Sequence, residues 1–351
     1  MNIWFISDTH FGFKNDSKTW ENRFKDCFDN FVFPLFEEGA EYGDILIHCG
    51  DVFDNRKAVG LSTLNFAMGV FERLGTMFSK VFVLCGNHDM HDTNSNDICS
   101  VDFFKHIPNV KVVKTPSMFD YGGLKIGLVP WITDTSVLSS ELRKMRGADF
   151  VACHADFNGV VMNASNTKSE SELKAEEAGL SCPIYSGHIH HRQKYKNIRY
   201  IGSPYQMSQS DRGNDRGVLR LSANGDETFY KNELSPTFER ISYDEIKELT
   251  MGEFKAFCKN KHLDVIVDAY LLSKCRFPNL YAYIDTHSDT YNINLIPEKD
   301  TGVQPSAPKI SMSECVSIEE MLDKYIDNVL EYDDKLKANL KKITKKLING
   351  Q

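Results

Sequence analysis

The stretch Val81-Phe82-Val83-Leu84-Cys85-Gly86-Asn87-His88-Asp89 decides the fold, because an apolar run passes directly into a polar loop. The run at residues 81–85 has the length and composition of a fully buried β-strand. Loops beyond the C-terminal ends of parallel strands are where α/β proteins place their chemistry. Asn, His and Asp supply oxygen and nitrogen donors that suit a divalent metal ion. A structural turn after a strand would look similar, so the meaning of this stretch depends on how the other strands end.

Four other predicted strands, at residues 3–6, 44–48, 149–153 and 183–185, also run into Asp or His side chains. Any one of these ends has a simple structural explanation, such as a buried histidine or an aspartate in a turn. Five such ends in one chain favour a shared site, because loops at the carboxyl edge of a sheet lie close together. The candidate ligands are Asp8, His10, Asp51, Asn87, His154, His188 and His190.

This donor set indicates two metal ions rather than one. Seven side chains exceed what one small divalent ion binds and are a natural number for two ions that share a bridging ligand. Nitrogen and oxygen donors without a thiolate suit Mn²⁺, Fe²⁺ or Zn²⁺, and availability rather than affinity decides which ion is bound. His48 lies inside a predicted strand and is expected in the core rather than among the ligands.

Residues 1–234 alternate short apolar strands with amphipathic helices. The helix predicted at residues 20–38 contains Pro34, which should end or kink it. Another helix is predicted at 134–145, where Asp134 is a suitable N-cap. This alternation predicts the α/β class, with a two-layer β-sheet core flanked by helices. Further helices are predicted at 61–77 and 99–106, and further strands at 110–113, 124–129, 199–201, 217–221 and 228–230.

Three further parts follow residue 234. Residues 235–297 are predicted to form a small α+β domain. Residues 298–313 have the Pro, Gly and Ser content of a linker. Residues 314–351 are predicted to form a helical hairpin that opens with the capping box Ser317-Ile318-Glu319-Glu320. The elements predicted in the small domain are a helix at 252–261 and strands at 265–267, 280–284 and 291–296.

The second helix of that hairpin has three interpretations. Its apolar residues recur at coiled-coil spacing among six lysines. The hairpin could pack on its own domain, or the lysine face could bind nucleic acid. The linker that precedes it favours instead a docking element for the helices of another protein. The apolar positions are Leu336, Leu340, Ile343 and Leu347.

Composition bounds the class of protein. The 351 residues include 49 acidic and 41 basic side chains, and this net charge of −8 does not suggest a free-standing nucleic-acid binder. Local basic patches and bound cations can still make the electrostatic potential near a site positive. Nine cysteines without a C-x-x-C pair predict reduced thiols in a cytoplasmic protein. No apolar run is long enough to span a membrane, and the N-terminus lacks the pattern of a signal peptide.

The motifs at the five strand ends resemble, in order and spacing, those of the calcineurin-like metallophosphoesterase superfamily over roughly the first two-thirds of the chain. They are Asp8-Thr9-His10, Gly50-Asp51-Val52-Phe53-Asp54, Gly86-Asn87-His88-Asp89, His154 and Gly187-His188-Ile189-His190. Ser7 to Gly12 and Gly202-Ser203-Pro204 are similar to the DNA-repair nuclease branch, of the Mre-eleven and SbcD type. Within that branch, Tyr185-Ser186 before the last motif, Tyr205-Gln206 and Arg216-Gly217 resemble the T-even-phage recombination endonuclease subunits.

The resemblance implies a role for each strand-end residue. One metal ion is expected on Asp8, His10, Asp51 and His190, and the other on Asp51, Asn87, His154 and His188, so that Asp51 is the bridge. His88 is expected to face the scissile phosphate, where its acid form would stabilise the transition state or protonate the leaving oxygen. Asp89 is expected to orient His88 or its loop. Some relatives place a second histidine where this chain has Asp54, so Asp54 is expected to be structural, while His91 and His191 match no family position and are expected at the surface.

The resemblance also implies a substrate and partners. It predicts a Mn²⁺-dependent DNA exonuclease and endonuclease, with Mg²⁺, Fe²⁺ or Zn²⁺ as alternative ions, acting as a subunit of a recombination and double-strand-break-repair complex. Residues 235–297 would then cap the DNA, and residues 314–351 would dock on the coiled-coil base of an SMC-like ABC ATPase. A homodimer is expected through the helices at 61–77 and 96–106. After the ligands, the basic residues Arg192, Lys194, Lys196 and Arg199 suit DNA phosphate contacts, although a solvated hairpin would also carry such charges.

Two other functions fit the same motifs. A calcineurin-like protein phosphatase or cyclic-nucleotide phosphodiesterase would apply the same metal chemistry to another substrate. A scaffold that keeps the fold and acts only by binding would not need a complete set of ligands. The completeness of the set therefore argues against the scaffold.

Overall fold

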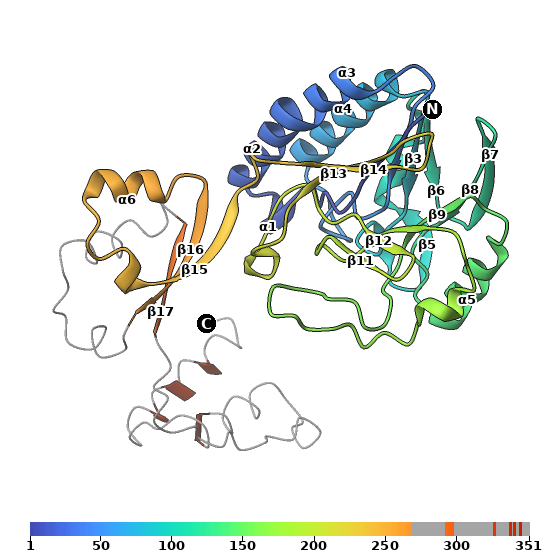
Figure 1. The fold of residues 1–351 in the computed structure, drawn as a ribbon. Coiled ribbons are helices and arrows are strands. Elements are labelled where there is room, and N and C mark those ends of the chain that lie inside the picture. Colours follow the sequence, from blue (N-terminus) through green and yellow to red (C-terminus); the bar gives the residue numbers. More distant parts are fainter. Residues whose placement is uncertain (268–291, 298–325, 328–336, 339, 342–343, 346–351) are drawn as a thin grey trace. The chain divides into compact units, whose positions relative to one another are not determined.

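The computed structural model in Figure 1 describes residues 1–267, 292–297, 326–327, 337–338, 340–341 and 344–345. The chain divides into two compact units. One comprises Met1–Ile266 and Arg276–Ile296, and the other comprises Val267–Cys275 and Pro297–Gln351. The domain boundaries at residues 234, 297 and 313 stay predictions. Among the described residues, no helix combines the length and apolarity needed to cross a bilayer.

The first of two six-stranded sheets carries three of the five motif-bearing strands. Its strands follow the order β14-β13-β1-β2-β3-β6, and the four strands β1, β2, β3 and β6 are parallel to one another. β13 joins the other side of β1 antiparallel and pairs with β14. The bounds are β1 Ile3–Ile6, β2 Ile45–His48, β3 Lys80–Leu84, β6 Val110–Val113, β13 Gly217–Leu221 and β14 Glu227–Lys231.

The second sheet carries the other two motif-bearing strands. Its order is β11-β12-β10-β9-β8-β7, with a parallel centre and an antiparallel strand at each edge. The register of β9 and β10 sets Gly187 opposite His154, so the two motifs emerge side by side. The bounds are β7 Ser117–Tyr121, β8 Leu124–Val129, β9 Phe150–His154, β10 Ile184–Gly187, β11 Gln193–Tyr195 and β12 Ile198–Tyr200.

The two sheets pack face to face because side chains alternate between the faces of each strand. On β1, Phe5 points into the core between the sheets and stacks on Tyr185 of β10, with ring centroids 4.3 Å apart. Trp4 points the other way, into the core beneath the helices. Helices α2 (Lys18–Cys27), α3 (Phe33–Gly39) and α4 (Leu61–Met77) lie together over the first sheet in Figure 1, and α5 (Thr135–Lys144) covers the second. The α/β prediction of a two-layer sheet core flanked by helices is confirmed.

The helix predicted at 20–38 shows the expected effect of Pro34 in an unexpected form. A π-helical segment, Phe28–Val32, joins α2 to α3, and Pro34 lies in the first turn of α3. Proline has no N–H to bond the preceding turn, and wider π turns are a common way to accommodate such a break. The helix therefore changes its hydrogen bonding there instead of ending.

Several other predicted elements match the structure closely. α4 has the predicted bounds, and the side chain of Asp134 caps α5 by accepting hydrogen bonds from the amides of Ser136 and Val137. The helix predicted at 99–106 is a 3₁₀ helix, Ser100–His106. The sequence pattern did not predict β7, β11, β15 (Thr237–Ser242) or the hairpin of β4 (Met90–Asp92) and β5 (Ser95–Cys99). The remaining short helices are α1 Phe13–Asp16 and the 3₁₀ turns Ala175–Ala178, Gln209–Asp211 and Tyr243–Glu245.

A third, three-stranded sheet follows residue 234, in the order β15-β16-β17. Its strands are Thr237–Ser242, Lys261–Val267 and Ile293–Pro297, and α6 is Met251–Phe257. The helix predicted at 252–261 ends early because Lys261 already begins β16. The strand predicted at 280–284 lies outside the described residues. So does most of the predicted C-terminal hairpin, whose described residues are helical, with Lys341 paired to Asp327 at 2.5 Å.

The prediction of reduced thiols throughout is wrong for Cys85 and Cys99, which form a disulfide. The β4–β5 hairpin returns the chain so that Cys99 lies opposite Met90, close to the end of β3. This long-range contact has no signature in the spacing of the two cysteines. The other described cysteines are free: Cys27, Cys49, Cys153, Cys182 and Cys258.

Asp44 fixes the edge of the first sheet opposite to the motifs. Its buried carboxylate accepts hydrogen bonds from the Asn2 amide at 2.6 Å and from Trp4 Nε1 at 3.1 Å. Burial alone would raise the pKa of Asp44, but these donors outweigh it and lower the pKa. A lowered pKa means that the stabilisation is present above about pH 4 and is lost as the pH falls through the folded-state pKa.

The substitution Asp44→Asn is expected to lower the free energy of unfolding by about 1–3 kcal/mol at pH 7, because buried donors lose their charged acceptor. Urea denaturation at pH 7 and at successively lower pH would measure this. The difference from the wild-type protein should shrink below about pH 4, because Asp44 takes up a proton there in the unfolded chain before it does so in the folded protein. Asp120→Asn, at an exposed position of β7, is the control. A pH-independent difference would contradict the role of the charge.

Candidate metal centre

The seven candidate ligands meet where the carboxyl ends of the two sheets adjoin. β1, β2 and β3 bring their loops from the first sheet, and β9 and β10 bring theirs from the second. The loops are joined by backbone hydrogen bonds, such as Asp8 N to Gly50 O at 3.0 Å. Residues 180 positions apart in the sequence, such as His10 and His190, are thereby brought within contact distance.

One cluster of donors comprises Asp8, His10 and His190, each of which offers an atom within 4.8 Å of the others. The Nε2 atoms of His10 and His190 lie 3.0 Å apart. A second oxygen, Oδ2 of Asp51, lies 3.7 Å from His10 Nε2. These donor atoms are close enough together to bind one ion jointly.

The second cluster comprises Asp51, His154 and His188, again with donors within 4.8 Å of one another. His154 Nε2 lies 3.3 Å from Asp51 Oδ2. Asn87 Oδ1 lies 3.0 Å from His154 Nε2 and 2.9 Å from His188 Nδ1, so the amide oxygen belongs to this cluster. Asp51 approaches both clusters, which is the position a bridging ligand requires.

The residues present fit divalent cations. Asp8 Oδ2 is buried and makes no hydrogen bond, and such an orphaned carboxylate oxygen is costly unless a cation meets it. His154 Nδ1 donates a hydrogen bond to the Cys49 carbonyl at 2.7 Å. The other ring nitrogen, Nε2, faces Asp51 and is left to bind a metal ion. The mixed imidazole, carboxylate and amide set suits Mn²⁺, Fe²⁺ or Zn²⁺.

The backbone is strained at four of these residues. Asp8, His10, Asp51 and His188 have φ values of 52°, 44°, 55° and 82°, in the left-handed region that non-glycine residues avoid. Each such residue costs about 1–3 kcal/mol, and such outliers cluster at functional sites. The folded chain therefore holds these side chains in place at the expense of stability.

Two glycines of the motifs allow the loops to pack this closely. A Cβ at Gly86 would collide with the backbone and carboxylate of Asp51. A Cβ at Gly50, where φ is 101°, would collide with the His154 imidazole. Both positions require glycine for close approach, which explains their place directly before the ligands.

The charges of the cluster follow from burial and from mutual contact. Burial alone would raise the pKa of Asp51, but the neighbouring His154 and His10 outweigh it, and the pKa is held well below its ordinary value. Burial would lower the pKa of His154, but Asp51 raises it to about 9. Burial lowers the pKa of His188 and of His190 to about 3, so both imidazoles are neutral and able to bind a metal ion.

His88 lies beside the two clusters, and one of its ring nitrogens is within 4.8 Å of donor atoms of His10 and Asp51. Its backbone amide donates to Asp51 Oδ1 at 2.8 Å, and its Nδ1 donates to the Asp54 carbonyl at 2.7 Å. The ring lies against that of His10, with centroids 4.8 Å apart. Nε2 is thus the ring nitrogen left for a ligand. The Asp54 side chain lies 3.3 Å from His10 Nδ1, where it orients a candidate ligand.

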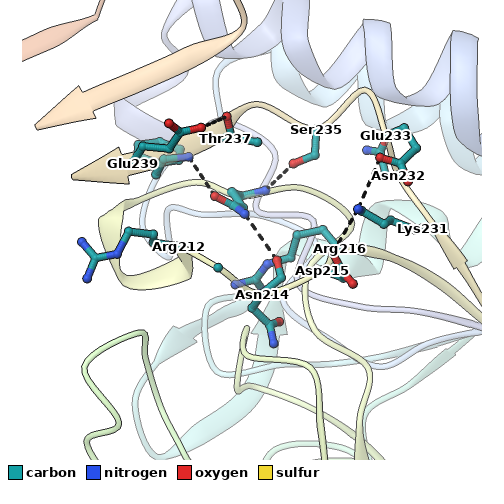
Figure 2. A pocket seen from close by; sticks show the side chains of 13 residues that line it. Arg212, Asn214, Asp215, Arg216, Lys231, Asn232, Glu233, Ser235, Thr237 and Glu239 are labelled. Carbon is teal, nitrogen blue, oxygen red and sulfur yellow. Dashed lines mark hydrogen bonds and ion pairs between the residues drawn. The ribbon is translucent and has the colours of Figure 1, made fainter. Parts of the chain in front are cut away.

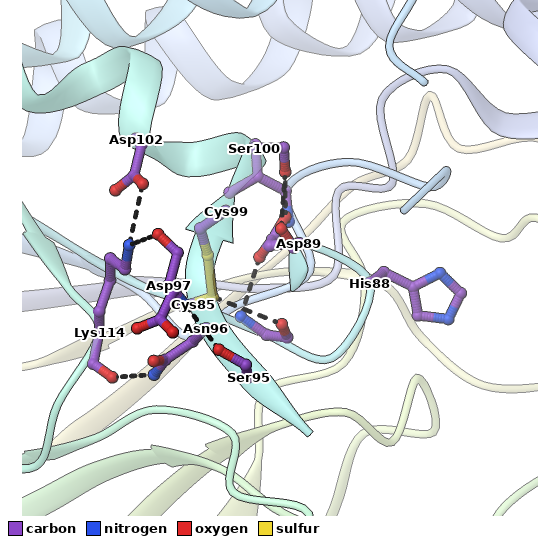
Figure 3. The surroundings of a disulfide bond; sticks show 12 residues. Cys85, His88, Asp89, Ser95, Asn96, Asp97, Cys99, Ser100, Asp102 and Lys114 are labelled. Atoms are coloured by element: carbon purple, nitrogen blue, oxygen red, sulfur yellow. Dashed lines mark hydrogen bonds and ion pairs between the residues drawn. A yellow bond between two sulfur atoms is a disulfide. The ribbon is translucent and has the colours of Figure 1, made fainter. Parts of the chain in front are cut away.

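Asp89 contacts loop amides rather than the His88 imidazole. Its carboxylate accepts from Val52 N at 3.0 Å, from Phe53 N at 3.1 Å and from Gly86 N at 2.9 Å. Burial and the nearby Asp51 carboxylate raise the pKa of Asp89 to about 7. Figure 3 shows Asp89 turned toward Ser100 and the Cys85–Cys99 disulfide, while His88 points away from them. Asp89 therefore ties the β3 loop to the β2 loop.

Three histidines outside the ligand set lie as follows. His48 is buried, and its Nε2 lies 3.1 Å from the Thr9 hydroxyl. His91 is exposed and His191 is half-buried. His48 is therefore a core residue, while His191 is less exposed than expected.

Sequence reasoning missed two residues that contact the ligands. The Trp131 ring lies tilted against that of His188, with ring centroids 4.7 Å apart, and the Trp131 amide donates to the Cys85 carbonyl at 2.9 Å. It follows β8 by two residues, but a search for donor atoms at strand ends passes over an aromatic side chain. Asp211 Oδ1 lies 3.8 Å from His190 Nδ1 and comes from a loop that no strand-end pattern would identify.

The basic stretch lies on the β11–β12 hairpin, where its charges are partly neutralised. Arg199 Nε pairs with Glu227 at 2.8 Å, and Lys196 pairs with Glu176. The Arg192 guanidinium lies 3.9 Å from the centroid of the Phe229 ring. Arg192 and Lys194 are exposed. These two side chains are therefore the better candidates for a polyanionic ligand.

Comparison with known proteins shows which family the chain belongs to. The sequence model of the calcineurin-like phosphoesterase family matches residues 1–192, which include every candidate ligand. The chain belongs to the calcineurin-like phosphoesterase family. The protein is therefore an enzyme that hydrolyses phosphate esters, and its strand-end clusters are candidate sites for the divalent metals of this phosphoesterase family.

Two characterised proteins are similar to this phosphoesterase. Exonuclease subunit 1 of Enterobacteria phage T4 is 24% identical over 290 residues, which are 82% of each chain. The DNA double-strand break repair protein Mre11 of Methanocaldococcus jannaschii is 29% identical over 85 residues, 24% of this chain and 22% of that protein. The solved structure of a protein of unknown function from Aquifex aeolicus was also matched, with 16% sequence identity and a TM-score of 0.27. The matched region is 44% of this chain and 80% of that chain.

Proposed function

We propose that this phosphoesterase is a DNA nuclease, an exonuclease and endonuclease, that uses two divalent metal ions, most readily Mn²⁺. The observation that carries the proposal is the pair of donor clusters joined by Asp51 at the strand ends. The substrate class is supported by similarity to a phage exonuclease subunit over 82% of both chains.

The proposed ligands divide between two ions. Asp8, His10, Asp51 and His190 would hold one ion, and Asp51, Asn87, His154 and His188 would hold the other. When bound, such a pair supplies an activated water and Lewis-acid stabilisation of the phosphoryl group. The protein holds four of these donors on residues with left-handed backbone conformations, which the packing of the surrounding loops maintains.

His88 is the proposed acid at the scissile phosphate. The Asp54 carbonyl fixes its Nδ1 proton, which leaves Nε2 to donate to a phosphoryl oxygen or to the leaving oxygen. Asp89 is the proposed positioning residue, because it fixes the loop that carries His88 to the amides of the neighbouring loop. Arg192 and Lys194 are proposed to contact DNA phosphates, with Lys196 and Arg199 contributing less because glutamates pair with them.

The substrate class is tested by comparing substrates with Mn²⁺ present. Duplex DNA ends and single-stranded DNA are expected to be cleaved much faster than p-nitrophenyl phosphate or cyclic nucleotides. Brisk hydrolysis of the small substrates without cleavage of DNA would instead favour the alternative, a phosphatase or cyclic-nucleotide phosphodiesterase. His88→Ala in the same assay separates either enzyme from a scaffold that acts only by binding.

We further propose that the enzyme is the nuclease subunit of a cytoplasmic recombination and repair complex. Residues 235–297 would cap the DNA, and residues 314–351 would dock on an SMC-like ABC ATPase. Deletion of the residues after Ser313 is expected to abolish co-purification with a co-expressed ATPase subunit, while Mn²⁺ binding is unchanged. Continued co-purification would contradict the docking role.

A homodimer is also proposed, through a surface patch at the start of α4 and beside the β4–β5 hairpin. Leu61, Ile98 and Phe103 are 85%, 65% and 53% exposed, and Ile98 and Phe103 line a cavity of about 530 Å³. Large exposed apolar side chains such as these are found at protein–protein contacts.

The double substitution Leu61→Glu and Ile98→Glu is expected to weaken dimerisation by at least about 30-fold, since a central interface residue contributes about 2 kcal/mol or more. Sedimentation equilibrium would measure the change. Tyr42→Glu is the control, because Tyr42 is 106% exposed and precedes β2, at the opposite edge of the sheet from the start of α4. A double variant that dimerises like the wild-type protein would refute this interface.

A further inference from the structure

The loop between β12 and β13 holds a buried ion pair that the proposed mechanism does not use. Asp211 is 3% exposed and Arg216 is 2% exposed. Arg216 Nη2 donates to Asp211 Oδ1 at 3.0 Å, and Nη1 donates to the Ser203 hydroxyl at 3.2 Å. Ser203 and Arg216 belong to two motifs, Gly202-Ser203-Pro204 and Arg216-Gly217, whose purpose the metal ligands leave unexplained.

The two carboxylate oxygens of Asp211 have separate partners. Oδ2 accepts from the amides of Met207 at 2.8 Å and Ser208 at 3.0 Å, so it fixes the turn on which Asp211 lies. Oδ1 accepts from Arg216 and also faces His190 Nδ1 at 3.8 Å. The opposite nitrogen of that imidazole, Nε2, points toward His10 and the first donor cluster. His190 therefore lies between a carboxylate and the place of an ion.

The same loop is fastened to the first motif and to the third sheet. The Tyr205 hydroxyl donates to the Thr9 carbonyl, between the candidate ligands Asp8 and His10. The Gln206 side chain accepts from the Phe238 amide at 2.9 Å and donates to the Asn214 carbonyl at 3.3 Å. Figure 2 shows Asn214, Arg216 and Ser235 around the adjoining cavity of about 350 Å³. These contacts fix the Asp211 turn independently of any ion.

We propose that Asp211 is a positioning residue for His190: its carboxylate, held by the amides of its turn, faces Nδ1 of the imidazole and so presents Nε2 to the metal ion of the first cluster. A metal-binding imidazole commonly gives its other N–H to a carboxylate, which fixes the tautomer and ring orientation and makes the ligand more basic. The inference rests on the metal assignment proposed above.

A purely structural role for Asp211 makes a different prediction. If the ion pair only holds the loop together, removing either partner should have the same effect on the site. If Asp211 acts through His190, the two partners differ, because only Asp211 faces the imidazole. Arg216→Gln breaks the ion pair but leaves the carboxylate, whereas Asp211→Asn keeps the shape and an oxygen for the turn amides but removes the charge beside His190.

The test is a titration of the metal-free full-length protein with Mn²⁺. Isothermal titration calorimetry measures the affinity and number of sites, and the electron paramagnetic resonance signal of free Mn²⁺ measures how much of the ion stays unbound. The wild-type protein is expected to bind two ions. Asp211→Asn is expected to weaken one of them by about 10- to 100-fold and to leave the other within about twofold, as for loss of an outer-shell partner. Arg216→Gln should change neither by more than about threefold. Asp215→Asn, at the exposed neighbouring position, is the matched control.

The outcomes separate the inference from its premise. Two wild-type sites with unchanged affinities in Asp211→Asn would overturn the positioning role and leave the metal centre standing. Equal losses in Asp211→Asn and Arg216→Gln would also overturn it, in favour of a structural ion pair. A wild-type protein that binds no Mn²⁺ would overturn both proposals. If Asp211→Asn does not fold, the double variant Asp211→Asn/Arg216→Gln avoids an unpaired buried cation, and the selective loss is expected there too.

Discussion

Replacing His88 with alanine is expected to reduce DNA cleavage by about 10²- to 10⁴-fold while both metal ions remain bound, as is typical for removal of a general acid. The imidazole contributes Nε2 to the site, whereas the contact of residue 88 with the proposed bridging ligand is made by its backbone amide, 2.8 Å from Asp51 Oδ1. Alanine keeps that amide. The substitution should therefore remove proton donation without disturbing Asp51.

The measurement compares kcat on a duplex DNA end with Mn²⁺ stoichiometry from calorimetry on the same preparations. His106→Ala is the matched control, because His106 is an exposed histidine remote in sequence from the five motifs. It should retain wild-type cleavage and metal binding. Loss of bound Mn²⁺ in His88→Ala would show that His88 is a ligand, and unchanged kcat would remove it from the chemistry.

Replacing Asp51 with asparagine is expected to weaken both ions together, each by more than about 100-fold, since loss of an outer partner alone costs roughly 10- to 100-fold. Asp51 Oδ2 lies 3.7 Å from His10 Nε2 and 3.3 Å from His154 Nε2, one in each cluster. Asparagine keeps the shape and removes the charge, so cleavage should fall below detection at Mn²⁺ concentrations that saturate the wild-type enzyme.

Thermal unfolding with and without Mn²⁺ provides an independent readout, because an ion that binds only the folded state raises the melting temperature. The wild-type protein should be stabilised by Mn²⁺, and Asp51→Asn should not be. Asp120→Asn is the control, since Asp120 is exposed on β7 and contributes to neither donor cluster. An Asp51→Asn protein that keeps one ion at wild-type affinity would contradict the bridging role.

The parts of the fold that could be predicted are those set by local pattern. α4 follows from apolar residues at helical spacing, and the start of α5 follows from Asp134, whose side chain caps the first turn. The candidate ligands could be identified for a similar reason. Each one follows a short buried strand, and parallel strands deliver their ends to one edge of a sheet.

The parts that could not be predicted depend on contacts between distant residues. The Cys85–Cys99 disulfide requires the β4–β5 hairpin to return, and neither cysteine is distinguished by its spacing. The carboxylate of Asp211 meets His190 because the amides of Met207 and Ser208 hold its turn, a contact between residues that are distant from the strand-end motifs. The basic residues Lys196 and Arg199 look available for DNA in the sequence, but glutamates from other segments pair with them.

We propose that this phosphoesterase cleaves DNA at the carboxyl ends of five strands, where Asp51 would join the sites of two metal ions. Crystals soaked with Mn²⁺ and a short duplex DNA end, measured near the manganese absorption edge, test it directly. Two anomalous peaks are expected, one beside Asp8, His10 and His190 and one beside Asn87, His154 and His188, with Asp51 between them and the scissile phosphate facing His88. A single peak, or a DNA end bound elsewhere, would contradict the claim.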